Sequence, residues 1–158
     1  MNQEYFIVEL ASAIHLGVPL ANMGTAVQFE VQSVCTVPGV ANFWHGVVKF
    51  KGSLLWVLDS DRFFNLSIPR NNRPQKLTAV ILKSEASVSQ KKVAIVTQQL
   101  KGIVTLEPSC LKPVVDNIPP QLRECCSAVV QIESQTTYII DSAVLLQQLH
   151  QQSILVSA

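Results

Sequence analysis

The fold of this chain is decided by the stretch FWHGVVKFKGSLLWVLD, residues 43–59. Two runs rich in β-branched and aromatic residues, His45 to Phe50 and Ser53 to Leu58, flank the dipeptide Lys51-Gly52. This spacing predicts a β-hairpin, because glycine accepts the positive φ that a two-residue turn demands. Lysine is not the favoured first turn residue, so the turn is expected to be slightly strained or to lie beside a bulge. Together with Lys49, the hairpin carries two cations near its tip.

The rest of the chain consists mostly of short segments with strand character. Apart from the hairpin, strands are expected at residues 5–10, 14–18, 33–37, 77–82, 93–96, 102–106, 128–132 and 137–140. A helical turn is expected within residues 20–27 and another over residues 61–64. Asp141 or Ser142 can cap a final helix that runs to about Gln151. Many short strands with one terminal helix predict an all-β protein built from small barrels or a sandwich, and several topologies stay open.

The length of 158 residues fits one compact domain, or two very small modules that share a core. Residues 65–76 contain Pro69, Pro74 and Asn71-Asn72, and are predicted to form a loop and the best internal boundary of the chain.

Composition excludes several classes of partner. The net charge is +1 and only 15% of the residues are charged, so the chain lacks the broad positive field that non-specific nucleic-acid binding uses. No apolar run approaches the roughly 18 residues that span a bilayer. The N-terminus has no signal-peptide layout. We therefore expect a cytoplasmic protein that binds no nucleic acid and does not insert into a membrane.

The four cysteines have no Cys-x-x-Cys pair and no metal-like spacing to histidine. Buried reduced thiols are the favoured interpretation, and they agree with a cytoplasmic location. A disulfide between the neighbours Cys125 and Cys126 is disfavoured because it would be strained.

Catalytic motifs are missing from the sequence. There is no phosphate-binding Gly-x-x-x-x-Gly-Lys-Ser/Thr, no Gly-x-Ser-x-Gly and no paired metal-binding histidines, so no enzyme activity, cofactor or metal is expected. Asp59 and Asp61 would face the same side of an extended strand and could bind a cation. The preferred interpretation is structural, with Asp59 accepting hydrogen bonds from backbone donors where the apolar strand stops.

A family resemblance rests on the order and spacing of residues around the hairpin. Val37-Pro38-Gly39, Phe43, the run Gly46 to Gly52 and the run Leu55 to Asp59 resemble the CheW-like family, whose members join chemoreceptors to a histidine kinase. The usual family pattern is Gly-Val-hydrophobic-Asn-Leu-Arg-Gly, followed by an apolar run that ends Pro-Val-hydrophobic-Asp-Leu. This chain departs from that pattern at four positions: Lys49 replaces Asn, Lys51 replaces Arg, Trp56 replaces Pro and Ser60 replaces Leu.

The resemblance implies a fold and a function. The fold would be two five-stranded barrels of the Src-homology-3 type, packed as one CheW-like domain over residues 1–158, with partly interleaved strands, a core between the barrels and a C-terminal helix. The function would be a non-catalytic adaptor that binds the regulatory domain of a histidine kinase and the tip of a receptor coiled coil. The altered signature and the many glutamines favour a divergent phototaxis or type IV pilus motility system over ordinary chemotaxis.

The resemblance also implies which residues contact partners. Val27 lies where many relatives carry a receptor-positioning Glu, and Gln98 stands where relatives usually carry Asp. The partner-binding residues expected from the resemblance are Val27, Gly46, Val47, Lys49, Lys51, Gly52, Leu100 and Ile103. Trp44 and Trp56 are equally suited to a core and to an interface.

Two alternatives stay open. A small ligand-binding or enzymatic β-barrel unrelated to signalling could share this strand pattern. The isolated regulatory domain of a kinase would share the fold. That alternative is disfavoured because the sequence starts at its first predicted strand, with no catalytic domain before it.

Overall fold

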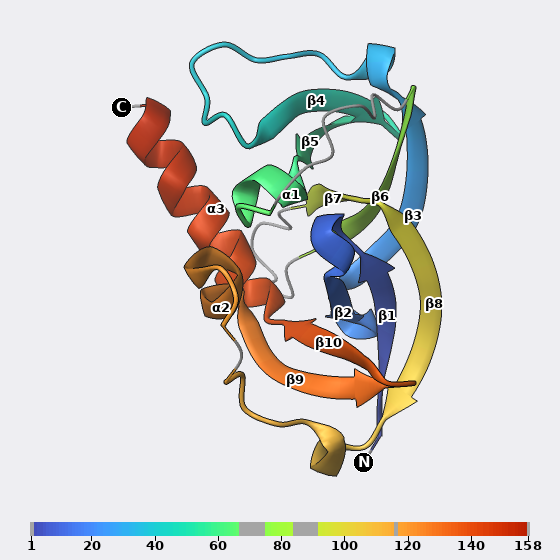
Figure 1. Ribbon diagram of the computed structural model, residues 1–158. Coiled ribbons are helices and arrows are strands. Elements are labelled where there is room, and N and C mark those ends of the chain that lie inside the picture. The colour runs from blue at the N-terminus through green and yellow to red at the C-terminus, as the bar shows by residue number, and fades with distance from the viewer. Residues whose placement is uncertain (1, 67–74, 84–91, 116, 158) are drawn as a thin grey trace.

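The computed structural model describes residues 2–66, 75–83, 92–115 and 117–157, with side chains described up to Gln152. In these described residues, two five-stranded sheets and three α-helices form the fold (Figure 1). The fold class predicted from the sequence, two five-stranded β units followed by a C-terminal helix, is confirmed.

The first sheet combines the N-terminal strands with strands from the C-terminal half. Its spatial order is β8 (Gln99–Leu106), β1 (Gln3–Glu9), β2 (His15–Pro19), β10 (Gln135–Ile140) and β9 (Cys126–Ile132). All neighbours in it are antiparallel except β2 and β10, which are parallel.

The second sheet is built from the middle of the chain. Its spatial order is β3 (Met23–Glu30), β6 (Lys76–Lys83), β7 (Lys92–Thr97), β5 (Ser53–Leu58) and β4 (Trp44–Phe50). Again one pair, β5 with β7, is parallel and the others are antiparallel.

The chain changes sheet at two places. It passes from β2 to β3 through a short 3₁₀ turn, Leu20–Asn22, and from β7 to β8 at Gln98. The boundary predicted near residues 65–76 is therefore not a boundary between the sheets, because the strands on either side of it, β5 and β6, both belong to the second sheet. A proline-rich loop signal marks a connection, but it does not reveal which sheet the next strand joins. Most of that loop, residues 67–74, lies outside the described residues.

The hairpin predicted at residues 45–58 is present. β4 and β5 pair in register up to Phe50 opposite Ser53, and the turn residues Lys51 and Gly52 have φ values of 51° and 80°. Two positive φ angles match the right-handed twist of the flanking strands. The register shifts between Trp44 and Gly46, so a bulge lies at the far end of the hairpin rather than at its turn.

One local prediction was wrong, and another is confirmed for only part of its segment. Residues 33–37 form no regular strand, and only Cys35 makes a single bridge, to Val47. The segment 20–27 holds the expected helical turn only in its first residues and then continues as strand β3. In the second segment tertiary pairing decided the structure, since β3 pairs with β6 along most of its length.

Three helices complete the fold. They are α1 (Ser60–Phe63), α2 (Pro120–Cys125) and α3 (Ser142–Ser157). Asp141 caps α3 as predicted, because its Oδ1 accepts a hydrogen bond from the backbone N–H of Val144 at 3.3 Å. Figure 1 shows α2 and α3 together on one flank of the molecule. In the described residues, no helix is both long and apolar enough to cross a bilayer.

Three apolar clusters hold the fold together. The largest lies between the sheets and receives Val8 and Leu16 from the first sheet, Val80 and Ile95 from the second, and residues of all three helices. A second cluster consists of side chains of the second sheet, around Val57. A third consists of side chains of the first sheet, around Ile7. The predicted core between the two barrels is therefore confirmed. Strands such as β6 are buried on both faces, which explains their nearly continuous apolar sequence.

Candidate functional site

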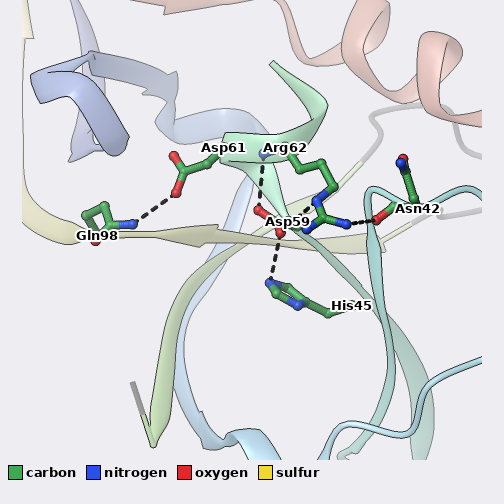
Figure 2. Close-up of polar contacts among 6 residues, drawn as sticks. All are labelled: Asn42, His45, Asp59, Asp61, Arg62 and Gln98. Carbon is green, nitrogen blue, oxygen red and sulfur yellow. Dashed lines mark hydrogen bonds and ion pairs between the residues drawn. The ribbon is translucent and has the colours of Figure 1, made fainter. Parts of the chain in front are cut away.

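A polar cluster surrounds α1, where strand β5 ends (Figure 2). Asp59 is the N-cap of α1, because its Oδ1 accepts a hydrogen bond from the backbone N–H of Arg62 at 3.2 Å. The other carboxylate oxygen, Oδ2, lies 3.8 Å from His45 Nε2 and 3.8 Å from Arg62 Nε. The guanidinium of Arg62 also donates to the backbone carbonyl of Asn42 at 3.4 Å. The sequence-based interpretation of Asp59 as a backbone acceptor is confirmed.

Asp61 has a different set of partners and is only 7% exposed. Its Oδ1 accepts a hydrogen bond from the backbone N–H of Ala11 at 2.8 Å, and its Oδ2 accepts one from Gln98 Nε2 at 2.9 Å. Asp61 belongs to α1 and not to an extended strand, so the predicted shared face with Asp59 was wrong. Figure 2 shows the two carboxylates contacting separate groups. They join parts of the fold and do not form a cation site.

Gln98 lies where an Asp is usual in the family that the sequence resembles. Its side-chain amide donates to Asp61, and its backbone N–H donates to the carbonyl of Glu9. An ionised Asp at this position could not donate a hydrogen bond to Asp61. The departure therefore matches the local chemistry of this chain.

The tip and outer face of the β4–β5 hairpin form the first candidate surface, called here the hairpin surface. Lys49, Lys51 and Gly52 are all exposed, and Lys51 Nζ lies 5.3 Å from the centre of the Phe50 ring. Leu54 stands directly opposite Lys49 and is 72% exposed. Leu54 was not among the predicted residues, because the unbroken apolar run 54–58 hides which of its members face outward. The period-two alternation from buried Leu55 and Val57 could have identified it.

Gly46 and Val47 have structural roles at the base of the same hairpin. Gly46 is buried with a φ of 141°, and a Cβ at this position would collide with the backbone carbonyl of Cys35. Val47 is half-buried and exchanges two backbone hydrogen bonds with Cys35, of 2.8 and 2.9 Å. The two residues hold the segment before β4 against the hairpin, so Gly46 offers a partner no side-chain surface.

The other predicted residues lie on two edge strands, β3 and β8, which are grouped as the second candidate surface, called here the edge surface. Val27 of β3 is half-buried against the core of the second sheet, and Leu100 of β8 is half-buried against the core between the sheets. Ile103 of β8 is 56% exposed. Figure 1 shows β3 and β8 along the same side of the molecule. The sequence-predicted residues therefore divide between two surfaces.

Aromatic side chains connect α1 with the hairpin. The ring centres of Phe63 and Phe43 are 5.0 Å apart, those of Phe43 and Trp44 are 5.4 Å apart, and those of Trp44 and Trp56 are 5.2 Å apart. Phe43 and Phe63 are buried, whereas both tryptophans are half-buried. Each tryptophan therefore lies partly in the core and partly at the surface, between the two placements that the sequence left open.

The cysteines only partly fit the prediction of buried thiols. Cys125 is buried and Cys126 half-buried, but Cys35 and Cys110 are exposed, and all four are free. Burial raises the pKa of the Cys125 thiol to about 11 and that of Cys126 to about 12. Both thiols are therefore neutral near pH 7, the unreactive form. Within the described ranges, no group of three or more potential metal ligands comes together.

A pocket of about 480 Å³ lies in the first sheet, beside the start of α3. Its described lining includes Tyr5, Lys83, Asp141 and Ser142. Asp141 is already engaged in capping α3, and Tyr5 donates its hydroxyl hydrogen to Gln3 at 2.9 Å. Two of these polar groups are therefore engaged in contacts within the fold.

Comparison of the sequence and the fold with known proteins identifies the family of this chain. The sequence matches the CheW-like domain over residues 4–150. Among solved structures, the scaffolding protein TtCheW from Thermoanaerobacter tengcongensis is similar, with a TM-score of 0.73 and 14% sequence identity over 89% of this chain and 90% of that chain. A comparison with curated proteins gives no match. The structural similarity shows a shared fold, and the sequence match covers nearly the whole chain. This protein therefore belongs to the CheW-like domain family.

Proposed function

We propose that this protein is a non-catalytic cytoplasmic adaptor that couples a chemoreceptor-type sensor to a histidine kinase. The observation that carries the proposal is the CheW-like match over residues 4–150, on a chain that presents two separate candidate surfaces. An adaptor needs two such surfaces, because it must hold both partners at once.

The hairpin surface and the edge surface differ in chemistry. The hairpin surface combines cationic Lys49 and Lys51 with exposed Leu54, whereas the edge surface offers the apolar side chains of Val27, Leu100 and Ile103. One surface would hold the regulatory domain of the kinase and the other the tip of the receptor coiled coil. Binding on both surfaces raises the effective concentration of each partner near the other.

The fold supports coupling between the two surfaces. The core between the sheets is continuous. Asp61 joins α1 to Ala11, which lies before β2, and to Gln98, which lies before β8. A rigid connection lets the state of a receptor on one surface change the free energy of kinase binding on the other. Allosteric coupling of this kind is reciprocal for binding, so kinase binding would equally change receptor affinity.

The system served would be a divergent one, phototaxis or type IV pilus motility. This part of the proposal is supported by the replacement of the usual Asn and Arg of the hairpin by Lys49 and Lys51. Changed contact residues on an interaction surface are a means of selecting a different partner.

A ligand-binding barrel is the competing function, and the pocket beside α3 is the observation that bears on it. The acidic residue of that pocket, Asp141, already caps a helix. The CheW-like match gives the adaptor the stronger support.

The experiment is affinity capture from the native cytosol, followed by mass spectrometry and by calorimetry with the purified kinase regulatory domain and receptor tip. A histidine kinase and a coiled-coil receptor are expected among the captured proteins. A variant with Lys49→Glu and Lys51→Glu should lose one partner, and a variant with Ile103→Asp should lose the other. Capture of neither protein would refute the adaptor function, and equal binding by both variants would refute the assignment of the two surfaces.

A further inference from the structure

The pocket beside the start of α3 combines groups of opposite charge. Its volume of about 480 Å³ lies within the range of roughly 300–1,000 Å³ that is usual for small-molecule sites. Lys83 reaches it from the end of β6 in the second sheet. Asp141 and Ser142 reach it from the start of α3, directly after β10 of the first sheet (Figure 1). The pocket therefore receives a cation and an anion from different sheets.

The two charges do not form an ion pair with each other. The ion pairs found in the described residues involve Glu9 and Asp59, and none joins Lys83 to Asp141. Asp141 uses Oδ1 to cap α3, by accepting from the backbone N–H of Val144 at 3.3 Å. Within the described ranges, no hydrogen bond uses its other oxygen, Oδ2. Asp141 can therefore accept a hydrogen bond from a ligand without giving up the cap.

The first turn of α3 offers two backbone donors to the same pocket. The first N–H groups of a helix have no acceptor within the helix. In α3 the N–H of Asp141 donates to the carbonyl of Cys125 at 2.7 Å, and that of Val144 donates to Asp141 Oδ1. Among the described residues, no hydrogen bond uses the N–H groups of Ser142 and Ala143, and both residues line the pocket. Two free donors at the positive end of a helix dipole favour a negatively charged ligand group.

The side chain of Ser142 independently indicates a missing partner. Ser142 is only 4% exposed, and its Oγ has no hydrogen-bond partner in the part of the chain that the structure describes. Buried polar side chains are nearly always hydrogen-bonded, because a buried hydroxyl without a partner costs free energy. A ligand in the pocket that Ser142 lines would supply this partner.

The arrangement of charges selects one class of ligand. A simple anion would be attracted by Lys83 and by the start of α3, but repelled by Asp141. A simple cation would be attracted by Asp141 and repelled by the other two. A ligand that carries both charges avoids both repulsions. The remaining lining includes the apolar side chains of Leu111, Ile139 and Ile140, which suit an apolar group on the same ligand.

We propose that this pocket binds a small zwitterion, a free α-amino acid with an apolar side chain. The ligand carboxylate lies between the ammonium of Lys83 and the N–H groups of Ser142 and Ala143, and the ligand ammonium donates to Asp141 Oδ2. The inference goes beyond the adaptor function and does not depend on it, because the pocket can be tested on the purified chain alone.

The test measures binding of L-leucine to the purified protein, by calorimetry and by the melting temperature, which a ligand of the folded state raises. Two matched probes each lack one charge: isocaproate lacks the amino group of leucine, and isoamylamine lacks its carboxyl group. We expect leucine to bind at millimolar concentration. Each matched probe should bind about tenfold more weakly or worse, because it loses hydrogen bonds between charged groups.

Two variants with matched controls locate the ligand. Asp141→Asn should bind leucine about tenfold more weakly while α3 stays capped, because Asn and Asp are equally good caps. Asp59→Asn is its control, since Asp59 also caps a helix but is absent from the lining of the pocket. Lys83→Gln should bind leucine similarly weakly. Lys76→Gln, at the opposite end of β6, should bind it as the wild type does.

Ser142→Ala distinguishes a role in binding from a role in the fold. Removing a buried hydroxyl that has no partner should leave the melting temperature of the free protein equal or higher, yet weaken leucine binding. Failure of leucine to bind at millimolar concentration would overturn the proposal. Isocaproate binding as tightly as leucine, and tighter still in Asp141→Asn, would overturn it in favour of a simple anion site. Unchanged leucine binding by both Asp141→Asn and Lys83→Gln would overturn the assignment to this pocket.

Discussion

The carboxylate of Asp61 lies 2.8 Å from the backbone nitrogen of Ala11 and accepts its hydrogen, across 50 residues of sequence. Ala11 follows the first strand of one sheet, and Asp61 lies in the helix that follows a strand of the other. The second oxygen of Asp61 accepts from Gln98, in the connection that crosses between the sheets. One buried side chain thus ties together three segments from both sheets.

Removing this carboxylate should destabilise the protein. In Asp61→Ala the buried N–H of Ala11 loses its acceptor, and an unsatisfied buried donor costs about 1–3 kcal/mol. Chemical denaturation should show a lower midpoint, and coupling between kinase and receptor binding should weaken.

Two further variants test this explanation. Asp61→Asn keeps one oxygen for Ala11, and the Gln98 amide can turn to present its oxygen, so the loss should be smaller than in Asp61→Ala. Asp59→Ala removes a helix cap and should cost about 1 kcal/mol without affecting coupling. Equal stability of Asp61→Ala and wild type would show that the hydrogen bonds of Asp61 contribute nothing to the fold.

The hairpin could be predicted from local sequence, because its signals are local. A two-residue turn with glycine and two strand-forming runs determine both the pairing and the register of residues 44–58. Asp59 could be assigned for the same reason, since a helix cap depends on residues three positions away.

The Asp61 contacts could not be predicted in this way. They join residues from distant parts of the chain, and neither Ala11 nor Gln98 carries a sequence signal for them. The interleaving of the sheets, with β1 and β2 joined to β8, β9 and β10, was available only through family resemblance. The exposure of Cys35 and Cys110 was missed because cysteine is usually buried, and composition does not place an individual side chain.

The inward face of the hairpin should not tolerate charge. Val57 is 0% exposed and Val48 5% exposed, in the same apolar cluster. Replacing either by Asp places an unpaired charge in an apolar core and should cost several kcal/mol, in a domain whose stability is on the order of 5–15 kcal/mol. Circular dichroism and thermal melting should show unfolded or strongly destabilised protein.

Leu54→Asp is the matched control, because Leu54 lies on the same strand and is 72% exposed. Its stability should stay within about 0.5 kcal/mol of the wild type. Folded protein from Val57→Asp, or unfolded protein from Leu54→Asp, would mean that the faces of the strand are assigned incorrectly.

Gly46 should be required for the fold. A Cβ there meets the backbone of Cys35, and the φ of 141° is one that other residues rarely adopt. Gly46→Ala should therefore lower the free energy of unfolding by about 3 kcal/mol or more. Gly39→Ala is the control, because Gly39 also has a positive φ, of 81°, but an added Cβ has open space. In Gly39→Ala the free energy of unfolding should fall only by the cost of holding alanine at a positive φ, about 1–2 kcal/mol. Similar losses in the two variants would exclude the collision with Cys35.

The thiols should fall into two classes of reactivity. Near pH 8 a thiol-specific reagent should modify exposed Cys35 and Cys110 quickly, and Cys125 and Cys126 slowly, because burial raises the pKa of the last two to about 11 and 12. Mass spectrometry after limited labelling identifies the modified residues. Rapid labelling of Cys125 in folded protein would contradict its burial.

The same pKa shifts predict how stability depends on alkaline pH. Below pH 9 these two thiols are protonated in both the folded and the unfolded chain. Between pH 9 and about 11 the unfolded chain releases its thiol protons while the folded protein keeps them, so the free energy of unfolding falls as pH rises. Denaturation of wild type and Cys125→Ala at several pH values should show a shallower decline in the variant. Parallel curves would indicate that Cys125 does not contribute to the pH dependence.

Lys51 should serve the partner and not the fold. It is exposed in the turn, with a φ of 51° that lysine does not favour, and its charge replaces the Arg usual in the family. Lys51→Glu should leave the melting temperature nearly unchanged and weaken binding to the kinase regulatory domain or the receptor tip. The loss is a few kcal/mol if the contact is desolvated and much less at a rim. Because lysine supplies charge without the bidentate geometry of arginine, binding should also be salt-sensitive.

Lys51→Asn separates the turn from the charge. Asn-Gly is the preferred sequence of a two-residue turn with two positive φ values, so this variant should melt at a higher temperature than the wild type. It should nevertheless bind the same partner more weakly at low salt, because the cation is gone. A variant that is more stable and binds less well can be explained only by a role of Lys51 in recognition. If both variants bind both partners as the wild type does, at low and at moderate salt, Lys51 has no part in the interface and exposed Leu54 becomes the main candidate on the hairpin surface.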